Sequence, residues 1–360
     1  MPDWSKSMQQ TFEYYTVDPG TWKDVKKLTT VKTCTITRDL EADTLGSASI
    51  DIEEDIGETY VRVYLITIQN GVQEKFPLGT FLVQTSPSSF DGKNKVIAAD
   101  AYSPLLELKE KLPPIGYYVP EGVNIMDQVY RIVRENVRAP VSKPSCSKTL
   151  FSDFVSDTQE NWITYITSLM LNANYILELD ETGRILFSPK QDVAALQPVT
   201  TFNDDNSSIL YPDIDMEQDL YGIPNVVEVV YSTENRVYVI KAKNNDPDSP
   251  VSIVNRGREI PYRETDPSIM GTPTIPQLQE YAGRLLKELS SIERVISYTH
   301  GYYPVRIGDC VRLNYTRAGI NNVKAKVISQ NISCEPGCPV TETAVYTTKL
   351  CGVIDYVTVE

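Results

Sequence analysis

The chain has 360 residues, with 34 Lys or Arg and 48 Asp or Glu, so its formal net charge is −14. This charge argues against nucleic-acid binding through an overall basic surface and against adsorption to an anionic membrane. His300 is the only histidine, which argues against a His-based triad, a multi-His metal site and a His proton relay. The length suffices for two to four domains, each with a core of its own.

Residues 31–102 are predicted to be all β, because polar and apolar residues alternate along several short runs. Asn70-Gly71 ends the run YVRVYLITIQ and predicts a tight hairpin, and Asp91-Gly92 predicts another. Closely spaced strands of this kind are typical of a small antiparallel barrel or sandwich. The run SASIDIE places Ala48, Ile50 and Ile52 on one face and Ser49, Asp51 and Glu53 on the other.

Residues 105–200 change to helical patterns. Asn124 is a candidate N-cap for a helix through IMDQVYRIVRENV. Asp157 and Glu160 form a capping-box variant before a second helix, NWITYITSLMLNAN, whose aromatic and apolar stripe is typical of a core. A hairpin that turns at residues 180–183 follows this helix. The segment is therefore predicted to be a compact α+β module that interrupts a β-rich chain.

From residue 206 the pattern returns to β, with a hairpin in PNVVEVVYSTENRVYVIKAKN that turns near residues 233–235. Four acids precede it at two-residue spacing, namely Asp213, Asp215, Glu217 and Asp219. In an extended strand all four carboxylates point to one side. The run lacks the glycine and the terminal glutamate of an EF-hand loop, so we favour a solvated strand face over a metal site.

Residues 244–272 form an excursion rich in Pro, Asp and Ser. A helix is expected next, with Thr274 as its N-cap and Pro276 in its first turn, and the remainder reads as β. The first residues do not resemble a signal peptide, and no run approaches 18 apolar residues. We therefore expect no transmembrane helix and synthesis in a cytoplasm.

The six cysteines suggest no clear metal site. Cys34 and Cys310 lie in strand-like runs, as small core residues do. Cys334 and Cys338 form C-E-P-G-C in a turn, which is either half of a zinc site, a local disulfide or a turn with two incidental thiols. We favour the incidental thiols, because Cys351 is the only other thiol nearby and a zinc site usually needs a second ligand pair. No cofactor is predicted.

Several motifs together resemble a known family. They are PLGTF leading to VIAADAYSPL, WITYITSLMLNANY with the LELDETGRILF hairpin, YGIPNVVEVVY, and YYPVRIGDCVRLNY followed by VKAKVISQNIS. In their order and spacing they resemble the baseplate hub, or tail-tip hub, proteins of tailed bacteriophages, which are related to the spike-hub proteins of contractile injection systems. The resemblance spans most of residues 30–350.

The resemblance implies a mainly β fold with α+β insertions, in which two tail-tube-like antiparallel β-barrel domains accompany a small α+β domain. The implied parts are an N-terminal arm (1–30), a first tube-like barrel (31–105), an α+β insert (106–205), a second tube-like barrel (206–243 and 293–360) and an insertion with a loop and a helix (244–292). It also implies a homotrimer that joins a six-fold tail tube to a three-fold spike or tail tip and lines the DNA channel.

The implied partners are a tail tube or distal tail ring protein, a spike or tail-tip protein, and the C-terminus of a tape-measure protein. Phage DNA would pass through without specific binding, and no membrane insertion is implied. The expected location is the virion tail, after assembly in the host cytoplasm.

A tail channel must let DNA pass without retaining it, and carboxylates repel phosphates whereas Lys or Arg would hold them. Given the resemblance, the candidate channel-facing acids are Asp51, Glu53, Asp213, Asp215, Glu217 and Asp219. The alternative is that these residues keep an outer surface soluble.

An enzymatic role is not predicted, because no H-E-x-x-H, G-x-S-x-G or P-loop pattern is present and no pair of carboxylates stands out. Two alternatives stay open: a carbohydrate-binding or adhesion β-protein of the tail, and, as a weaker one, a peptidoglycan-cleaving tail enzyme. The 22 Tyr and 3 Trp suit sugar stacking, but Tyr is equally suited to large oligomeric interfaces.

Overall fold

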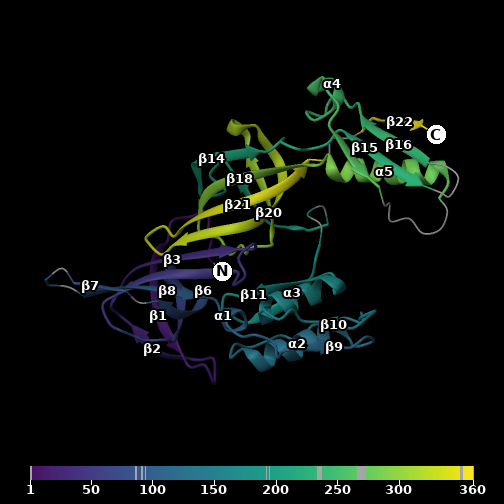
Figure 1. Cartoon of the computed structure of the whole chain (residues 1–360). Helices are drawn as coiled ribbons and strands as arrows, with labels where there is room; N and C mark the ends of the chain where they lie inside the picture. Colours follow the sequence, from purple (N-terminus) through teal and green to yellow (C-terminus); the bar gives the residue numbers. More distant parts are fainter. Residues whose placement is uncertain are drawn as a thin grey trace. The chain divides into compact units, whose positions relative to one another are not determined.

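The computed structural model describes residues 2–359 except 86, 91, 94, 192, 194, 233–236, 266–272 and 349–351. Strands predominate and helices are few (Figure 1), which confirms the predicted mainly β fold with α+β insertions. The chain divides into two compact units, Met1–Ile214 with Ser297–Ala344 and Asp215–Ile296 with Val345–Glu360. The domain boundaries expected from the sequence stay a prediction.

The N-terminal β region consists of eight strands among the described residues. These are β1 (Gln9–Val17), β2 (Asp24–Leu28), β3 (Val31–Asp39), β4 (Gly46–Ile52), β5 (Tyr60–Gln69), β6 (Val72–Thr85), β7 (Ser88–Phe90) and β8 (Lys95–Tyr102). The predicted turn at Asn70-Gly71 joins β5 to β6, and both residues have the positive φ, 52° and 78°, that suits a tight hairpin turn. Ala48, Ile50 and Ile52 are buried in one core, as expected. Asp91, in the second predicted turn, lies outside the described residues.

The C-terminal strands continue the same sheet. They are β13 (Pro198–Asn203), β14 (Leu210–Gln218), β18 (Ile292–Gly301), β19 (Cys310–Tyr315), β20 (Ile320–Ser333) and β21 (Pro339–Thr348), with a 3₁₀ turn η1 (Thr316–Ala318). The main path of the sheet runs β14-β18-β21-β20-β3-β4-β8-β6-β5-β1-β2, with β7 on β8 and β13 on β19, which pairs with β20. The antiparallel β20–β3 pair, from Ser329–Asp39 to Ser333–Thr35, therefore joins two regions far apart in sequence.

The predicted α+β module lies between these two sets of strands in sequence. Its elements are α1 (Leu106–Lys109), β9 (Tyr118–Val119), α2 (Ile125–Asn136), β10 (Phe154–Val155), α3 (Trp162–Ala173), β11 (Tyr175–Leu179) and β12 (Ile185–Pro189). Asn124 caps α2, since its side chain accepts a hydrogen bond from the Asp127 amide at 3.0 Å. The stripe on α3 is core, as predicted, with Trp162, Tyr165 and Leu169 buried.

The predicted start of α3 is wrong by one turn. Asn161 is the N-cap, because its side chain accepts from the Thr164 amide at 2.9 Å. Glu160 instead accepts from the backbone amide of Asp157 at 3.1 Å, in a turn before the helix. Both Asp and Asn suit an N-cap, so the capping-box pattern alone did not distinguish the two candidate sites.

The β11–β12 hairpin fixes the α+β module to the β strands of the same unit. It turns at residues 180–183 as predicted, and the Thr182 carbonyl accepts hydrogen bonds from Trp22 Nε1 at 2.8 Å and from Arg62 Nη2 at 3.2 Å. Glu181 binds Arg306 through two contacts of 2.5 Å. At the turn, a Cβ on Gly183 would lie 2.9 Å from the Thr80 Cβ. The backbone of the hairpin can therefore lie this close to Thr80 only because residue 183 is glycine.

The second unit has a four-stranded sheet in the order β17-β15-β16-β22, covered by one helix. Its elements are β15 (Val226–Ser232), β16 (Val237–Asn244), α4 (Ile253–Arg256), β17 (Pro261–Glu264), α5 (Ile275–Leu289) and β22 (Ile354–Val359). Thr274 caps α5 in a capping box with Gln277, as predicted for the helix start. The predicted turn near residues 233–235 lies outside the described residues. Across the part of the chain described, no helix has the length and apolarity needed to span a membrane.

Candidate channel-facing surface

One face of the large sheet carries small polar side chains across six neighbouring strands. On these strands the alternate residues are buried in the core, so the intervening residues turn to the opposite face. These residues, which we call the Ser/Thr face, are Ser297 and Thr299 on β18, Thr341 and Thr343 on β21, Asn331 and Ser333 on β20, Thr33, Thr35 and Thr37 on β3, Ser47, Ser49 and Asp51 on β4, and Asp100 on β8. All are exposed or half-buried.

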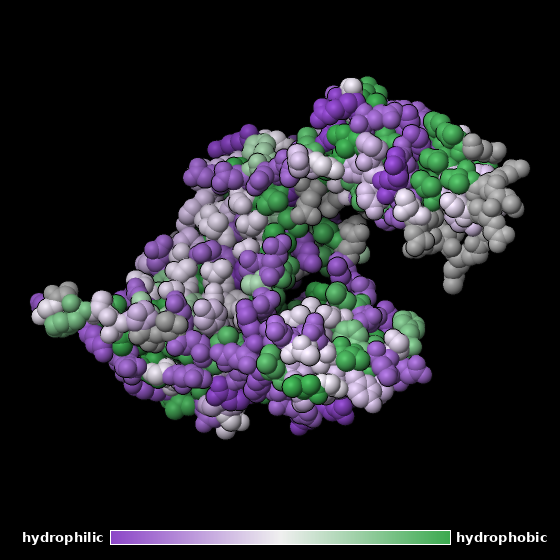
Figure 2. Space-filling view, in the orientation of Figure 1, coloured by the Kyte–Doolittle hydropathy of each residue, from purple (hydrophilic) through white to green (hydrophobic). Residues whose placement is uncertain are grey.

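The strand register aligns these side chains in rows. One row runs across four strands through Ser333, Thr35, Ser49 and Asp100, each paired with the next. Hydroxyl pairs continue the face between β21 and β18, with Thr341 and Thr299 at 2.9 Å and Thr343 and Ser297 at 3.2 Å. Figure 2 shows pale residues of intermediate hydropathy over β18 and β21. Because Thr favours strands, the rows also stabilise the sheet that displays them.

The Ser/Thr face holds two carboxylates, Asp51 and Asp100, and no lysine or arginine. Proteins hold DNA chiefly by neutralising phosphates with cationic side chains, which releases counterions. A hydroxyl surface with a small negative excess lacks that source of affinity. The face is therefore suited to lie against a polyanion without retaining it.

Of the predicted acids, Asp51 lies on this face and Glu53 lies just beyond it. Asp51 accepts a hydrogen bond from the Thr33 hydroxyl at 2.6 Å. Glu53 follows the last residue of β4 and forms an ion pair with Lys32 at 2.8 Å, with both side chains partly exposed. The charge of Glu53 is thus partly compensated, whereas Asp51 has a neutral partner.

The other predicted acids lie on or next to β14, which four strands separate from β4 in the sheet order. Asp213, Asp215 and Glu217 occupy alternate positions of this strand and are all exposed, as an extended run requires. Asp219 lies beyond the strand and accepts from the Tyr221 amide at 2.7 Å. Whether either set faces a channel stays a prediction.

The hydroxyl residues of the Ser/Thr face were not predicted as part of a site, because the predicted site residues were chosen by their negative charge. A signal was present in VKTCTITRD, where Thr33, Thr35 and Thr37 alternate with buried residues, and in SASIDIE. Hydroxyl residues on alternate positions of adjacent strands, Thr33, Thr35 and Thr37 on β3 with Ser47 and Ser49 on β4, are the pattern that identifies this surface.

The single histidine lies in a buried polar cluster of the first unit. His300 and Glu342 are both fully buried, with Nε2 and Oε1 3.3 Å apart. Glu342 also accepts hydrogen bonds from the Tyr298 hydroxyl at 2.5 Å and from Gln330 Nε2 at 2.6 Å. Burial alone would raise the pKa of Glu342, but the His300 charge and these hydrogen bonds hold it below its usual value. The cluster has the character of a structural core.

The C-E-P-G-C turn lies next to a third cysteine, Cys34, which is buried in β3 as its strand-like pattern predicted. Cys34 on β3 lies in contact with Cys334, and Cys338 packs in the same core. The Cys334 amide donates to the Cys34 carbonyl at 3.0 Å. Within the described residues, no group of three or more His, Cys, Asp or Glu side chains is arranged to hold a metal ion. Cys351 lies outside those residues.

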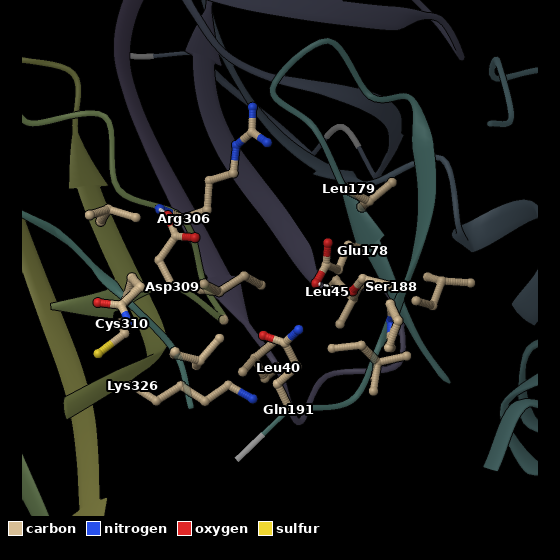
Figure 3. A pocket seen from close by; sticks show the side chains of 18 residues that line it. Leu40, Leu45, Glu178, Leu179, Ser188, Gln191, Arg306, Asp309, Cys310 and Lys326 are labelled. Atoms are coloured by element: carbon tan, nitrogen blue, oxygen red, sulfur yellow. Dashed lines mark hydrogen bonds between the residues drawn. The ribbon is translucent and has the colours of Figure 1, made fainter. Parts of the chain in front are cut away.

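A pocket lies between the β11–β12 hairpin and the turn that precedes β19 (Figure 3). Asp309 reaches it from one wall, and Glu178 and Ser188 from the opposite one. Burial raises the pKa of Asp309, which accepts from the Arg306 amide at 2.8 Å. Glu178 accepts from the Ser188 hydroxyl at 2.5 Å. Both carboxylates thus have partners that give them a role in holding the turn and the hairpin.

Two solved structures are similar to this chain over almost its whole length. A tail protein from Neisseria meningitidis MC58 superposes with a TM-score of 0.60 at 12% identity, covering 93% of this chain and 97% of that one. The 43 kDa tail protein of prophage MuSo2 from Shewanella oneidensis also has a TM-score of 0.60, at 14% identity, covering 93% and 98%. The chain has the fold of phage tail proteins.

The resemblance expected from the sequence is thereby confirmed at the level of the fold. No protein-family model and no curated protein sequence matches the chain. The shared fold covers both β-rich regions and the α+β module together, because each comparison spans more than nine-tenths of both chains.

Proposed function

We propose that this chain is a structural protein of a phage tail, namely a baseplate hub without enzymatic activity. The observation that carries the proposal is the fold it shares with two phage tail proteins over 97% and 98% of their lengths. The proposed plan has tube-like regions at 31–105 and at 206–243 with 293–360, and the inserts 106–205 and 244–292 outside them. Two tube-like regions per chain would let three chains match a six-subunit ring.

The open ends of the large sheet support assembly with other chains. β14 is an end of the sheet order, and an end strand exposes backbone groups that need a partner or cover. Tyr211 and Met216 on β14 are large apolar side chains that are 39% and 54% exposed. In the proposed homotrimer a neighbouring chain would cover such edges.

In this proposal the Ser/Thr face and the candidate acids line the channel, through which DNA passes without specific binding. The proposed partners are a tail tube or distal ring protein, a spike or tail-tip protein, and the C-terminus of a tape-measure protein. The protein would be assembled in the host cytoplasm and reside in the tail of the virion. The neutral to acidic character of the face supports this role, because it offers no cation to phosphates.

The oligomeric state tests the hub directly. Light scattering on the purified chain should give three times 40.5 kDa, or 121.5 kDa, and electron microscopy should show a ring with a central opening. The measurement should be made over a range of micromolar concentrations, with and without the tail tube protein. A particle that stays at 40.5 kDa under all these conditions would contradict the hub and favour an adhesion module.

A further inference from the structure

Cys34 on β3 and Cys334, the residue directly after β20, lie opposite each other in the sheet. The register pairs Ser333 with Thr35, so the next position pairs Cys334 with Cys34. The backbone hydrogen bond from the Cys334 amide to the Cys34 carbonyl, at 3.0 Å, confirms that the two residues lie opposite each other. Both cysteines are free thiols.

Directly opposed residues of an antiparallel pair have Cα atoms about 4.5–5.5 Å apart, within the range that a disulfide spans. The two side chains also point the same way, since the thiols contact each other and pack into one core beside Tyr14. Cys334 is the last residue before the exposed turn of Glu335, Pro336 and Gly337, and its side chain is half-buried.

The two thiols differ in access, which sets the order of the steps. Cys34 is 3% exposed, whereas Cys334 is half-buried at the mouth of the core. The contact with the Cys334 thiol and burial raise the pKa of Cys34 well above its usual value, and burial raises that of Cys338. Cys334 is therefore the thiol that meets an external oxidant.

We propose that Cys34 and Cys334 form a disulfide that links β3 to β20 when the protein meets an oxidising disulfide such as oxidised glutathione. The Cys334 thiolate attacks one sulfur of that disulfide and releases one glutathione thiolate. Cys34 then loses its proton and attacks the Cys334 sulfur of the mixed disulfide, which releases the second glutathione. Two protein thiols are oxidised and one glutathione disulfide is reduced to two thiols.

The bond would close a loop of 300 residues, from Cys34 to Cys334, and join the two β-rich regions covalently. Thiols stay reduced in a cytoplasm and pair in oxidising surroundings, so the link would form after the protein leaves the cell that made it. The bond follows from the cysteine positions alone and does not depend on the proposed tail function.

The test is to incubate the reduced full chain with oxidised glutathione, block free thiols, digest it and identify linked peptides by mass spectrometry. We expect a Cys34–Cys334 peptide and a melting temperature about 5–10 °C above that of the reduced protein. Linkage of Cys334 to Cys338, a stable glutathione adduct on wild-type Cys334, or no reaction would each overturn the proposal.

Three variants separate the steps. Cys34→Ala should accumulate the glutathione adduct on Cys334, because the second thiol is missing. Cys334→Ala should take up no glutathione at the buried Cys34. Cys338→Ala is the matched control and should still form the link; failure of this variant to do so, with its fold retained, would assign the reaction to Cys338 instead.

Discussion

At the scale of single residues, the buried carboxylate of Glu342 stabilises the core only if its hydrogen-bond partners are all present. Removing a charge from water is costly unless every partner is in place, and here Tyr298, Gln330 and His300 all contact it. Gln330 extends the cluster, since its Oε1 accepts from Arg38 Nη1 at 3.0 Å. The cluster thus connects β18, β20 and β21 to β3 through polar contacts within the core.

Replacement of Glu342 by leucine should lower the free energy of unfolding by about 3–5 kcal/mol, because it leaves buried donors without an acceptor. Chemical unfolding of the variant measures this. Thr341→Ala, on the exposed face of the same strand, is the control and should lower stability by about 1 kcal/mol or less, through the loss of its strand propensity and its pairing with Thr299. Equal effects of the two variants would show that the cluster does not stabilise the fold.

The same carboxylate predicts a dependence on pH. Its pKa in the folded chain lies below the usual value of 4.5, so its contribution to stability is present above that value and is lost as pH falls through the lower folded pKa. The difference in unfolding free energy between wild type and Glu342→Gln should therefore shrink as the pH is lowered from 7 to 3. A difference that stays constant over this range would contradict the assigned shift.

At the scale of elements, the β11–β12 hairpin depends on one glycine. Gly183→Ala places a Cβ at φ +79° and 2.9 Å from the Thr80 Cβ, so both backbone strain and a clash oppose it. We expect a loss of about 2–4 kcal/mol of unfolding free energy, measured by chemical unfolding.

Gly122→Ala is the matched control for this prediction. Gly122 has a similar φ of +76°, but a Cβ there would meet nothing within 4 Å. The control should cost only the strain of the left-handed conformation, about 1–2 kcal/mol. If both variants lose the same stability, close docking of the hairpin onto Thr80 contributes nothing.

The elements that could be predicted are those whose signals are local. Asn124 and Thr274 cap their helices and Asn70-Gly71 turns its hairpin, because each needs only the residues within one turn. The parallel β13–β19 pair and the β20–β3 pair were not foreseen. Their partners are more than 100 residues apart, and no local pattern encodes which distant strands meet.

At the scale of the whole molecule, the proposed DNA channel can be tested by changing the charge of the Ser/Thr face. Asp51→Lys with Asp100→Lys adds two cations to the Ser/Thr face and raises the formal charge by four, from −14 to −10. If the chain forms the proposed trimer, this variant should retain DNA at low salt and release it as salt rises, and phage carrying it should eject DNA more slowly. Filter binding and ejection assays measure the two effects.

Glu121→Lys with Glu135→Lys is the control, since it makes the same change in charge at exposed sites of the α+β module. It should leave DNA retention and ejection close to those of the wild type. If the two double variants behave alike, the Ser/Thr face does not line the DNA path, whatever the oligomeric state.

The Ser/Thr face could be predicted from the sequence only in part. Net charge directed attention to acids, of which Asp51 lies on the Ser/Thr face. The hydroxyl residues are individually unremarkable, and only the register of Ser333, Thr35, Ser49 and Asp100 across four strands makes them one surface. The Cys34–Cys334 contact was missed for the same reason, since 300 residues separate the two thiols in sequence.

The β20–β3 pairing also has a consequence for biosynthesis. Asp39 pairs with Ser329, 290 residues later in the chain. At about 5–20 residues per second, a ribosome needs roughly 15–60 s to make that interval. During this time the edge of β3 that later pairs with β20 has no partner. The nascent chain can therefore form wrong strand pairs until translation is nearly finished.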